Sequence, residues 1–176
     1  MRGLTLDTFN SIMDKTTIKP RLKRELRFVA STAAMPAEAW KDTELFAIKD
    51  RNGNKGVLLV EIASGLYVFP YEFKRTNISS VTGRAEAVIC DLCKTWQSGS
   101  NAGSISFIDA KKATSNVAYL CCADLACSKH VRTQTPAAKV SRAQLRENLD
   151  NDQRVERLRT RLEKIMKYVE AEPVKY

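Results

Sequence analysis

The apolar residues near the start of the chain recur at the spacing of an amphipathic helix. Leu6, Phe9, Ile12 and Met13 fall on one face of a helical projection. Pro20 then opens the run PRLKRELRFV, and proline is favoured at the first position of a helix. The pattern therefore predicts two short helices ahead of the first strand.

Between residues 44 and 73 the pattern changes to short apolar runs that are typical of strands. The run ELFAIKD ends just before Asn52-Gly53, a dipeptide typical of a tight turn. The next run, VLLVEIASGLYVFPYEF, is divided by Ser64-Gly65 into two strand-like halves. Together these runs predict an antiparallel meander.

Two more strand-like runs, ISFIDA and NVAYLC, flank the turn-like segment KKATS, so residues 105–121 are predicted to form a hairpin. The segment TQTPAAKV has the composition of a linker. After it come two sequences that resemble capping boxes, Ser141-x-x-Gln144 and Asp150-x-x-Gln153. The second predicts the start of a longer C-terminal helix.

This C-terminal helix carries apolar residues on one face and cations on the others. The apolar positions are separated by three or four residues: Val155, Leu158, Leu162, Ile165 and Val169. The repeat covers only about two heptads, which is short for a coiled coil. We therefore expect the helix to dock on the sheet or on the N-terminal helices.

Composition sets limits on size, compartment and partners. The chain has 176 residues, 44 % of them hydrophobic, which is enough for one core and a small satellite. It has no apolar run near the roughly eighteen residues of a membrane span and no signal-peptide core at its start, so we expect a cytoplasmic protein without a membrane partner. The formal net charge of +9 favours RNA or an acidic protein surface as partner.

The clearest chemical signal is a set of four cysteines in two close pairs, Cys90-x2-Cys93 and Cys122-x4-Cys127. Zn²⁺ takes four thiolates in a tetrahedron, and a short loop brings two of them to one ion. Cys127 stands where a helix can begin. The spacing predicts one structural zinc ion in a treble clef, made of a knuckle, a hairpin and a helix.

Three alternatives concern the same segment. Disulfides need an oxidising compartment, and five cysteines leave one unpaired. Cys121 stands beside Cys122, but the two alternate across the strand, so we expect Cys121 to be a small buried apolar residue. His130, the single histidine, is the other alternative ligand, although four thiols already have suitable spacing.

The sequence lacks a strong catalytic pattern. It contains neither a Gly-rich phosphate loop nor a paired nucleophile and base. A four-thiolate zinc site is closed to substrate and contributes to folding. We therefore expect a protein that is not an enzyme and has no small-molecule substrate.

Three segments, ICDLCKTWQSGS, YLCCADLACSKHVR and RVERLRTRLEKIMKYVE, occur in this order and make the chain resemble the FBP family. These are proteins with the treble-clef zinc finger of the elongation factor G-binding proteins, related to the FusB-type fusidic acid resistance proteins. The resemblance implies zinc ligands at Cys90, Cys93, Cys122 and Cys127. The resemblance also implies binding to elongation factor G or the ribosome, and a relation to fusidic acid resistance.

Candidate partner contacts lie around the two cysteine pairs. For elongation factor G they are on the first knuckle and the hairpin; for the alternative, direct RNA binding, cations neutralise phosphates and an aromatic ring stacks on a base. The candidates are Trp96, Phe107, Lys111, Lys112, Lys129 and Arg132.

The predicted fold class is α+β. It combines short N-terminal helices, an antiparallel meander, a treble-clef zinc module and a C-terminal amphipathic helix. We place the N-terminal helices and sheet in residues 1–85, the zinc module, packed on the sheet, in 86–135, and the linker and last helix in 136–176. The three parts are expected to form one compact unit.

Overall fold

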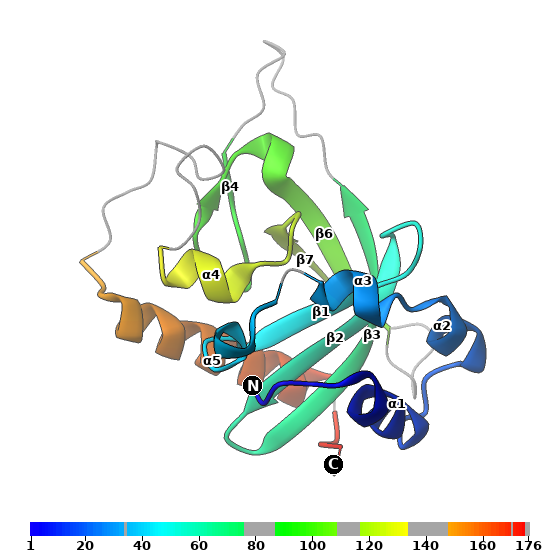
Figure 1. The fold of residues 1–176 in the computed structure, drawn as a ribbon. Helices are drawn as coiled ribbons and strands as arrows, with labels where there is room; N and C mark the ends of the chain where they lie inside the picture. Colours follow the sequence, from blue (N-terminus) through cyan, green and yellow to red (C-terminus); the bar gives the residue numbers. More distant parts are fainter. Residues whose placement is uncertain (34, 76–86, 109–116, 134–147, 170, 175–176) are drawn as a thin grey trace.

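Five antiparallel strands form the central sheet in the computed structural model of the protein (Figure 1). The structure describes residues 1–33, 35–75, 87–108, 117–133, 148–169 and 171–174. Within them the strand order is β1-β2-β3-β6-β7. The strands are β1 (Leu45–Lys49), β2 (Lys55–Ile62), β3 (Gly65–Arg75), β6 (Ala102–Phe107) and β7 (Val117–Cys122).

Short helices flank the sheet, and one long helix ends the fold. A second, two-stranded sheet pairs β4 (Val88–Ile89) with β5 (Trp96–Gln97). The helices are α1 (Leu6–Asp14), α2 (Pro20–Glu25), α3 (Phe28–Thr32), α4 (Cys127–Val131) and α5 (Asn151–Tyr168), with the 3₁₀ turns η1 (Ala37–Trp40) and η2 (Gly99–Asn101). The predicted α+β class is thus confirmed.

The helix predicted to open at Pro20 is interrupted earlier than the sequence indicated. The chain leaves helical geometry at Leu26, which forms a β-bridge with Asp50. The next residue, Arg27, donates its N–H to the carbonyl oxygen of Lys49 at 2.9 Å. Pairing with the edge of β1 therefore separates α2 from α3.

The alternation of side chains along the strands divides the core into two clusters, one on each face of the sheet. In β2, Leu58 and Val60 belong to one cluster, whereas Val57 and Leu59 belong to the other. Successive side chains of a strand point to opposite faces. The run VLLV is continuous in sequence because both faces are covered.

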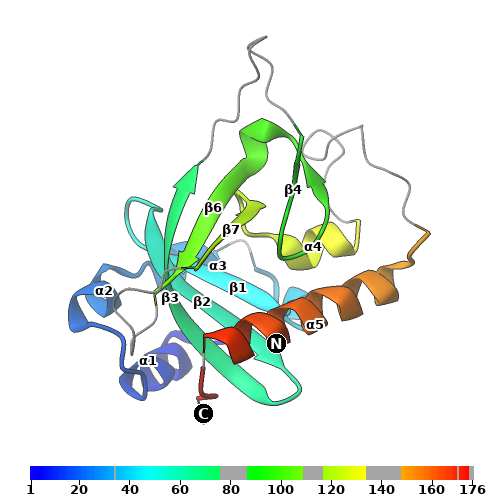
Figure 2. The same cartoon turned by 180° about the vertical axis from the view of Figure 1, so that it is seen from behind.

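The N-terminal helices cover one face, where Phe9 of α1 stacks on Phe28 of α3 with ring centroids 4.7 Å apart. Trp40 is 6 % exposed and belongs to the same cluster. The other face is covered by α4 and α5 (Figure 2).

Helix α5 begins as predicted. Asp150 Oδ1 accepts the N–H of Gln153 at 2.8 Å, and Gln153 Oε1 accepts the N–H of Asp150 at 3.1 Å. These two bonds form the capping box. The apolar face of the helix is buried against the sheet, through Val155, Leu158, Leu162 and Ile165. The first capping box, at residues 141–144, lies outside the described residues, as does most of the predicted linker.

The hairpin between the two cysteine pairs belongs to the main sheet. Strand β6 pairs with β3, with Tyr71 opposite Phe107 and Phe73 opposite Ile105. The hairpin therefore extends the N-terminal meander rather than lying on top of it. The division of the chain at residues 85 and 135 remains a prediction. In the part of the chain that the structure describes, none of the helices combines the length and the apolar character of a membrane span.

Candidate metal centre

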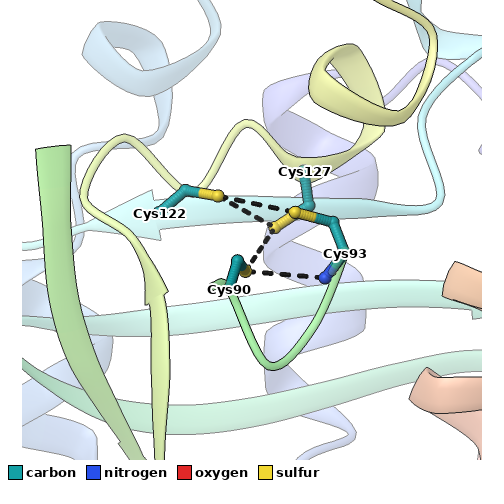
Figure 3. Close-up of side chains that lie close together, drawn as sticks. All are labelled: Cys90, Cys93, Cys122 and Cys127. Carbon is teal, nitrogen blue, oxygen red and sulfur yellow. Dashed lines mark hydrogen bonds between the residues drawn. The ribbon is translucent and has the colours of Figure 1, made fainter. Parts of the chain in front are cut away.

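Four cysteine sulfurs meet between the first knuckle and the end of β7 (Figure 3). They are those of Cys90, Cys93, Cys122 and Cys127, and each residue is at most 1 % exposed. The Sγ atoms of Cys90 and Cys127 are 3.8 Å apart, those of Cys93 and Cys122 3.6 Å, and those of Cys122 and Cys127 3.9 Å. The four predicted ligands are thus brought together.

These separations suit one tetrahedral zinc ion. Four sulfurs at roughly 2.3 Å from a central Zn²⁺ lie roughly 3.8 Å from one another. The observed separations of 3.6 to 3.9 Å are much longer than the roughly 2.05 Å of a disulfide. The cluster therefore fits a structural zinc ion, and the cysteines do not form disulfides.

The first knuckle is a tight turn between β4 and β5. Lys94 donates its N–H to the carbonyl oxygen of Cys90 at 2.8 Å, and Cys90 donates its own N–H to Thr95 at 3.0 Å. Lys94 takes a left-handed conformation with φ of 58°. The N–H of Cys93 points at Cys90 Sγ, 3.5 Å away, so the main chain stabilises the thiolate charge.

The second half of the site joins the end of β7 to α4. Cys122 is the last residue of β7, and Cys127 is the first residue of α4, as predicted. Between them the chain turns through Leu125, whose φ of 57° is left-handed. The Leu125 N–H donates to the carbonyl oxygen of Cys122 at 3.0 Å and closes this loop.

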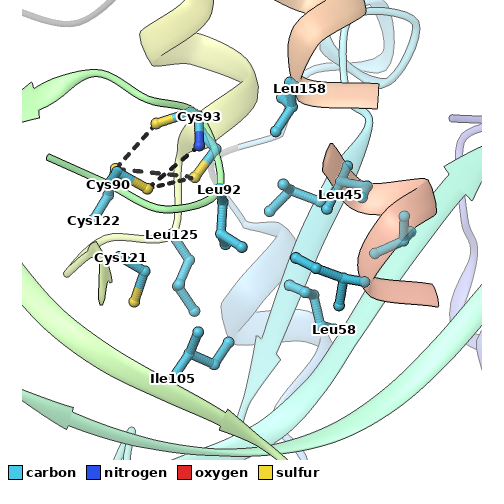
Figure 4. Close-up of a cluster of buried hydrophobic side chains, with 14 of the residues drawn as sticks. Leu45, Leu58, Cys90, Leu92, Cys93, Ile105, Cys121, Cys122, Leu125 and Leu158 are labelled. Carbon is cyan, nitrogen blue, oxygen red and sulfur yellow. Dashed lines mark hydrogen bonds between the residues drawn. The ribbon is translucent and has the colours of Figure 1, made fainter. Parts of the chain in front are cut away.

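Both knuckles contain an Asp-Leu pair, in which the leucine is buried and the aspartate accepts a main-chain hydrogen bond. Leu92 is 0 % and Leu125 is 4 % exposed, and both point from the cluster into the core (Figure 4). Asp91 Oδ2 accepts the N–H of Leu120 at 2.9 Å, which ties the knuckle to β7. Asp124 Oδ1 accepts the N–H of Ala126 at 3.0 Å. Sequence alone predicts no role for these four residues, although the repeated Asp-Leu pair is a signal of two similar turns.

A buried hydrogen-bond network leads from one zinc ligand to the only histidine. The hydroxyl of Thr95 lies 3.0 Å from Cys93 Sγ, and the Gln97 amide donates to Thr95 Oγ1 at 2.8 Å. The same amide lies 3.3 Å from His130 Nδ1, and His130 Nε2 lies 3.0 Å from Asp124 Oδ1. The Gln97 amide faces Nδ1 as a donor, which fits the tautomer whose Nε2 carries a proton toward Asp124. His130 thus supports the site from outside the four sulfurs.

Cys121 lies outside the sulfur cluster. Its side chain is 0 % exposed in the core cluster on the same face of the sheet as α5. Burial raises the pKa of the Cys121 thiol, so the group stays protonated at neutral pH. The prediction of a small buried apolar residue is confirmed.

Helix α5 contacts the first knuckle through two arginines. Arg157 reaches the carbonyl oxygen of Cys93 at 3.5 Å, and Arg161 Nε donates to the carbonyl oxygen of Asp91 at 3.2 Å. The Arg161 guanidinium also lies 5.4 Å from the ring centroid of Tyr119. A zinc tetrathiolate carries two negative charges, and these two cations are bonded to the main chain of the knuckle that supplies two of the thiolates.

Two of the predicted partner contacts are structural instead. Phe107 is 2 % exposed and packs against Phe69, with ring centroids 5.9 Å apart. Arg132 donates to both carboxylate oxygens of Glu44, at 2.9 and 2.6 Å, and its side chain is 13 % exposed. These corrections follow from burial, because neither group is open to a partner.

The other predicted contacts differ in their placement. Trp96 is half-buried in β5, opposite Ile89 of β4. Lys129 is exposed on α4. Lys111 and Lys112 lie outside the described residues.

Glu44 connects three parts of the fold. Burial acts to raise the pKa of the Glu44 carboxyl, but the hydrogen bonds from Arg132 and the charge of Arg159 hold that pKa below its ordinary value. Arg159 of α5 lies 3.4 Å from the carboxylate, and the Glu44 N–H donates to Ser128 Oγ at 3.0 Å. The start of β1, α4 and α5 are thus joined at one ionised group.

A zinc knuckle, a β-hairpin and a helix that starts at the last ligand define a treble-clef zinc-finger protein. The comparison with family models agrees: the FBP C-terminal treble-clef zinc-finger model matches residues 17–169. The chain belongs to this family. Searches of curated proteins and of solved structures gave no match.

Proposed function

We propose that this protein is an adaptor of translation that binds elongation factor G, alone or on the ribosome, in the cytoplasm. The observation that carries the proposal is family membership over residues 17–169, together with the elongation factor G binding that the sequence resemblance implies. A relation to fusidic acid resistance belongs to the same proposal.

The outer side of the first knuckle is the surface that we assign to this partner. Ile89 is 42 % and Leu120 is 38 % exposed, and Trp96 lies opposite Ile89 on the paired strand. Leu120 is joined to the knuckle through both hydrogen bonds with Asp91. Exposed apolar groups held on a rigid turn are suited to a protein interface, because binding them costs little ordering.

The proposal includes no enzymatic activity. Four buried thiolates complete the coordination of a zinc ion, so a substrate has no open position on the metal. Zinc in such a site supplies folding free energy, on the order of 10 kcal/mol or more in small zinc modules. The metal would therefore hold the binding surface in shape.

The test is a gel-filtration titration of the zinc-loaded protein against purified elongation factor G, at low and at physiological salt. We expect a complex that persists at physiological salt and weakens at least about tenfold in Trp96→Ala and Ile89→Asp, as for residues at the centre of an interface. Val29→Asp is the matched control, because Val29 is 66 % exposed on α3, away from the knuckle. Failure to form a complex at either salt would reject the proposal.

Direct RNA binding is the second candidate, and the formal net charge of +9 favours it. Lys129 is exposed beside the second knuckle, and Trp96 offers a ring for stacking. RNA binding through phosphate contacts falls steeply with added salt. A ribosomal RNA complex that is lost between low and physiological salt, without a complex with elongation factor G, would favour this candidate.

A further inference from the structure

The outer edge of β1 offers main-chain groups for pairing. β1 is an end strand of the sheet, and alternate residues of an antiparallel strand direct their main-chain groups to the same edge. Glu61 donates its N–H to the carbonyl oxygen of Glu44 at 3.0 Å, and Asp50 donates to Lys55 at 2.9 Å. The main-chain N–H and carbonyl groups of even-numbered residues of β1 therefore point toward β2. Those of Leu45, Ala47 and Lys49 point to the outer edge.

The chain itself covers both ends of this outer edge. The N–H of Lys49 donates to Ser31 Oγ at 3.2 Å, and its carbonyl oxygen accepts the N–H of Arg27 at 2.9 Å. At the other end the N–H of Leu45 lies 3.5 Å from Ser128 Oγ. Between them, the Leu45 carbonyl and both main-chain groups of Ala47 have no hydrogen-bond partner in the described ranges.

A groove of about 740 Å³ follows these free groups. Helix α3 and α4 flank it, because they cover opposite faces of the sheet next to β1 (Figure 1). Met35 and Phe46 supply apolar surface on the side of α3, and Leu125 and Ala126 supply it on the side of α4. The groove thus has a polar floor and two apolar walls.

The charge of the groove is positive. Its two acids already have partners, since Asp50 accepts the N–H of Lys55 at 3.3 Å and Asp124 accepts the N–H of Ala126 at 3.0 Å. Its four cations form no ion pair with any residue that the structure describes: Arg27, Lys49, Arg51 and Lys129. An occupant with carboxylates would complement them.

We propose that this groove binds an extended acidic peptide segment of another protein, which adds a strand to the sheet beside β1. The main chain of the peptide pairs with Leu45 and Ala47, and its alternate side chains contact the two apolar walls. Main-chain bonds give affinity and side-chain contacts give specificity in this mode of recognition. β1 and β7 are opposite edges of the sheet, so this site is separate from the knuckle surface and goes beyond the proposed function.

The first test uses a fluorescent peptide of alternating Glu and Val residues, titrated with the zinc-loaded full chain. We expect saturable binding, no binding of the matching Lys and Val peptide, and at least about tenfold weaker binding in Lys49→Glu and Lys129→Glu. Lys167→Glu, an exposed lysine on α5, is the matched control and retains binding. Equal binding of the two peptides, or unchanged binding in Lys129→Glu, would overturn the site.

The second test follows the Ala47 amide by hydrogen exchange. We expect the Glu and Val peptide to slow exchange at Ala47, and an N-methylated version, which cannot donate to the strand, to lose this effect. Binding without protection of Ala47, or a dimer of the chain that protects Ala47 instead, would overturn strand addition by this peptide. Ile89→Asp removes the elongation factor G surface and leaves peptide binding unchanged, so the two proposals can fail separately.

Discussion

Arg161 of α5 donates from Nε to the carbonyl oxygen of Asp91, at a distance of 3.2 Å, inside the first zinc knuckle. The two residues are 70 positions apart in sequence. Asp91 also binds Leu120 of β7 through its carboxylate and its N–H. The knuckle is therefore fixed from two directions, by the sheet edge and by the last helix.

We expect Arg161→Ala to lower the free energy of unfolding by about 1 to 2 kcal/mol, since the variant loses a charge-assisted hydrogen bond and the contact with Tyr119. Urea unfolding of the zinc-loaded protein measures this loss. Lys164→Ala removes an exposed cation from the same helix and should change stability by no more than about 0.5 kcal/mol. Equal losses in both variants would mean that the contact with Asp91 contributes nothing.

The zinc content of cysteine variants should distinguish the four ligands from the neighbouring Cys121. We expect one zinc ion per chain in the wild type, by elemental analysis after dialysis, and its loss in Cys93→Ala because three thiolates no longer fill the tetrahedron. Cys121→Ala should keep the ion, since this sulfur lies outside the cluster. Retained zinc in Cys93→Ala, or lost zinc in Cys121→Ala, would contradict this ligand set.

The buried network should tune zinc affinity. Thr95→Val keeps the shape of the side chain but removes the hydroxyl that lies 3.0 Å from Cys93 Sγ. Loss of a group that supports a metal ligand costs about 10- to 100-fold in affinity, and competition with a chromogenic chelator measures it. Ser98→Ala, which removes a hydroxyl bonded only to exposed Ser100 among described side chains, should leave zinc affinity unchanged.

Glu44 should make stability depend on pH. Its pKa is lowered in the folded protein, so its stabilising effect is complete above the ordinary glutamate pKa of roughly 4.3 and is lost as pH falls through the lower folded value. At pH 7 we expect Glu44→Gln to cost about 3 kcal/mol, because Arg132 loses its buried partner. Unfolding of both proteins from pH 7 to pH 3 should show this difference shrinking below about pH 4. If the difference in unfolding free energy stayed constant over this pH range, the cost of Glu44→Gln would not come from the loss of the ionised carboxylate.

Gly56 permits Tyr71 to cross β2. A Cβ atom at Gly56 would lie 2.3 Å from the carbonyl oxygen of Ile48 and 2.7 Å from Tyr71 Oη. Gly56→Ala should therefore destabilise the protein by more than about 3 kcal/mol. Gly53→Ala is the control: it meets no atom within 4 Å but has a φ of +73°, so it should cost about 1 kcal/mol. Thermal unfolding compares the two variants, and equal midpoints would exclude the clash.

The sequence predicted the features that depend on local spacing. The two cysteine pairs, the pairing of the two hairpin strands and the capping box of Asp150 and Gln153 are set by residues a few positions apart, and all appear in the structure. The predicted turn KKATS of the hairpin lies outside the described residues. The burial of Phe107 could also have been predicted from the sequence. Ile105 and Phe107 alternate with Ser104 and Ser106, which indicates a strand with one buried face.

The remaining features depend on contacts between distant residues. Arg132 looks like a surface cation in sequence, but its partner Glu44 is 88 positions away. The pairing of β3 with β6 joins segments on either side of the first knuckle, whereas strands that follow one another in sequence are the usual neighbours. The end of α2 before Leu26 also depends on a distant contact, because Leu26 forms a β-bridge with Asp50.

The pairing of β6 with β3 has a consequence for work on isolated fragments. A peptide limited to residues 86–135 retains all four thiols but loses β3, which covers one edge of β6. The main-chain groups of that edge would be unpaired along the apolar residues Ile105 and Phe107, and an uncovered edge of an apolar strand recruits other chains. Such a fragment should bind zinc and still aggregate, so the finger is best studied within the full chain.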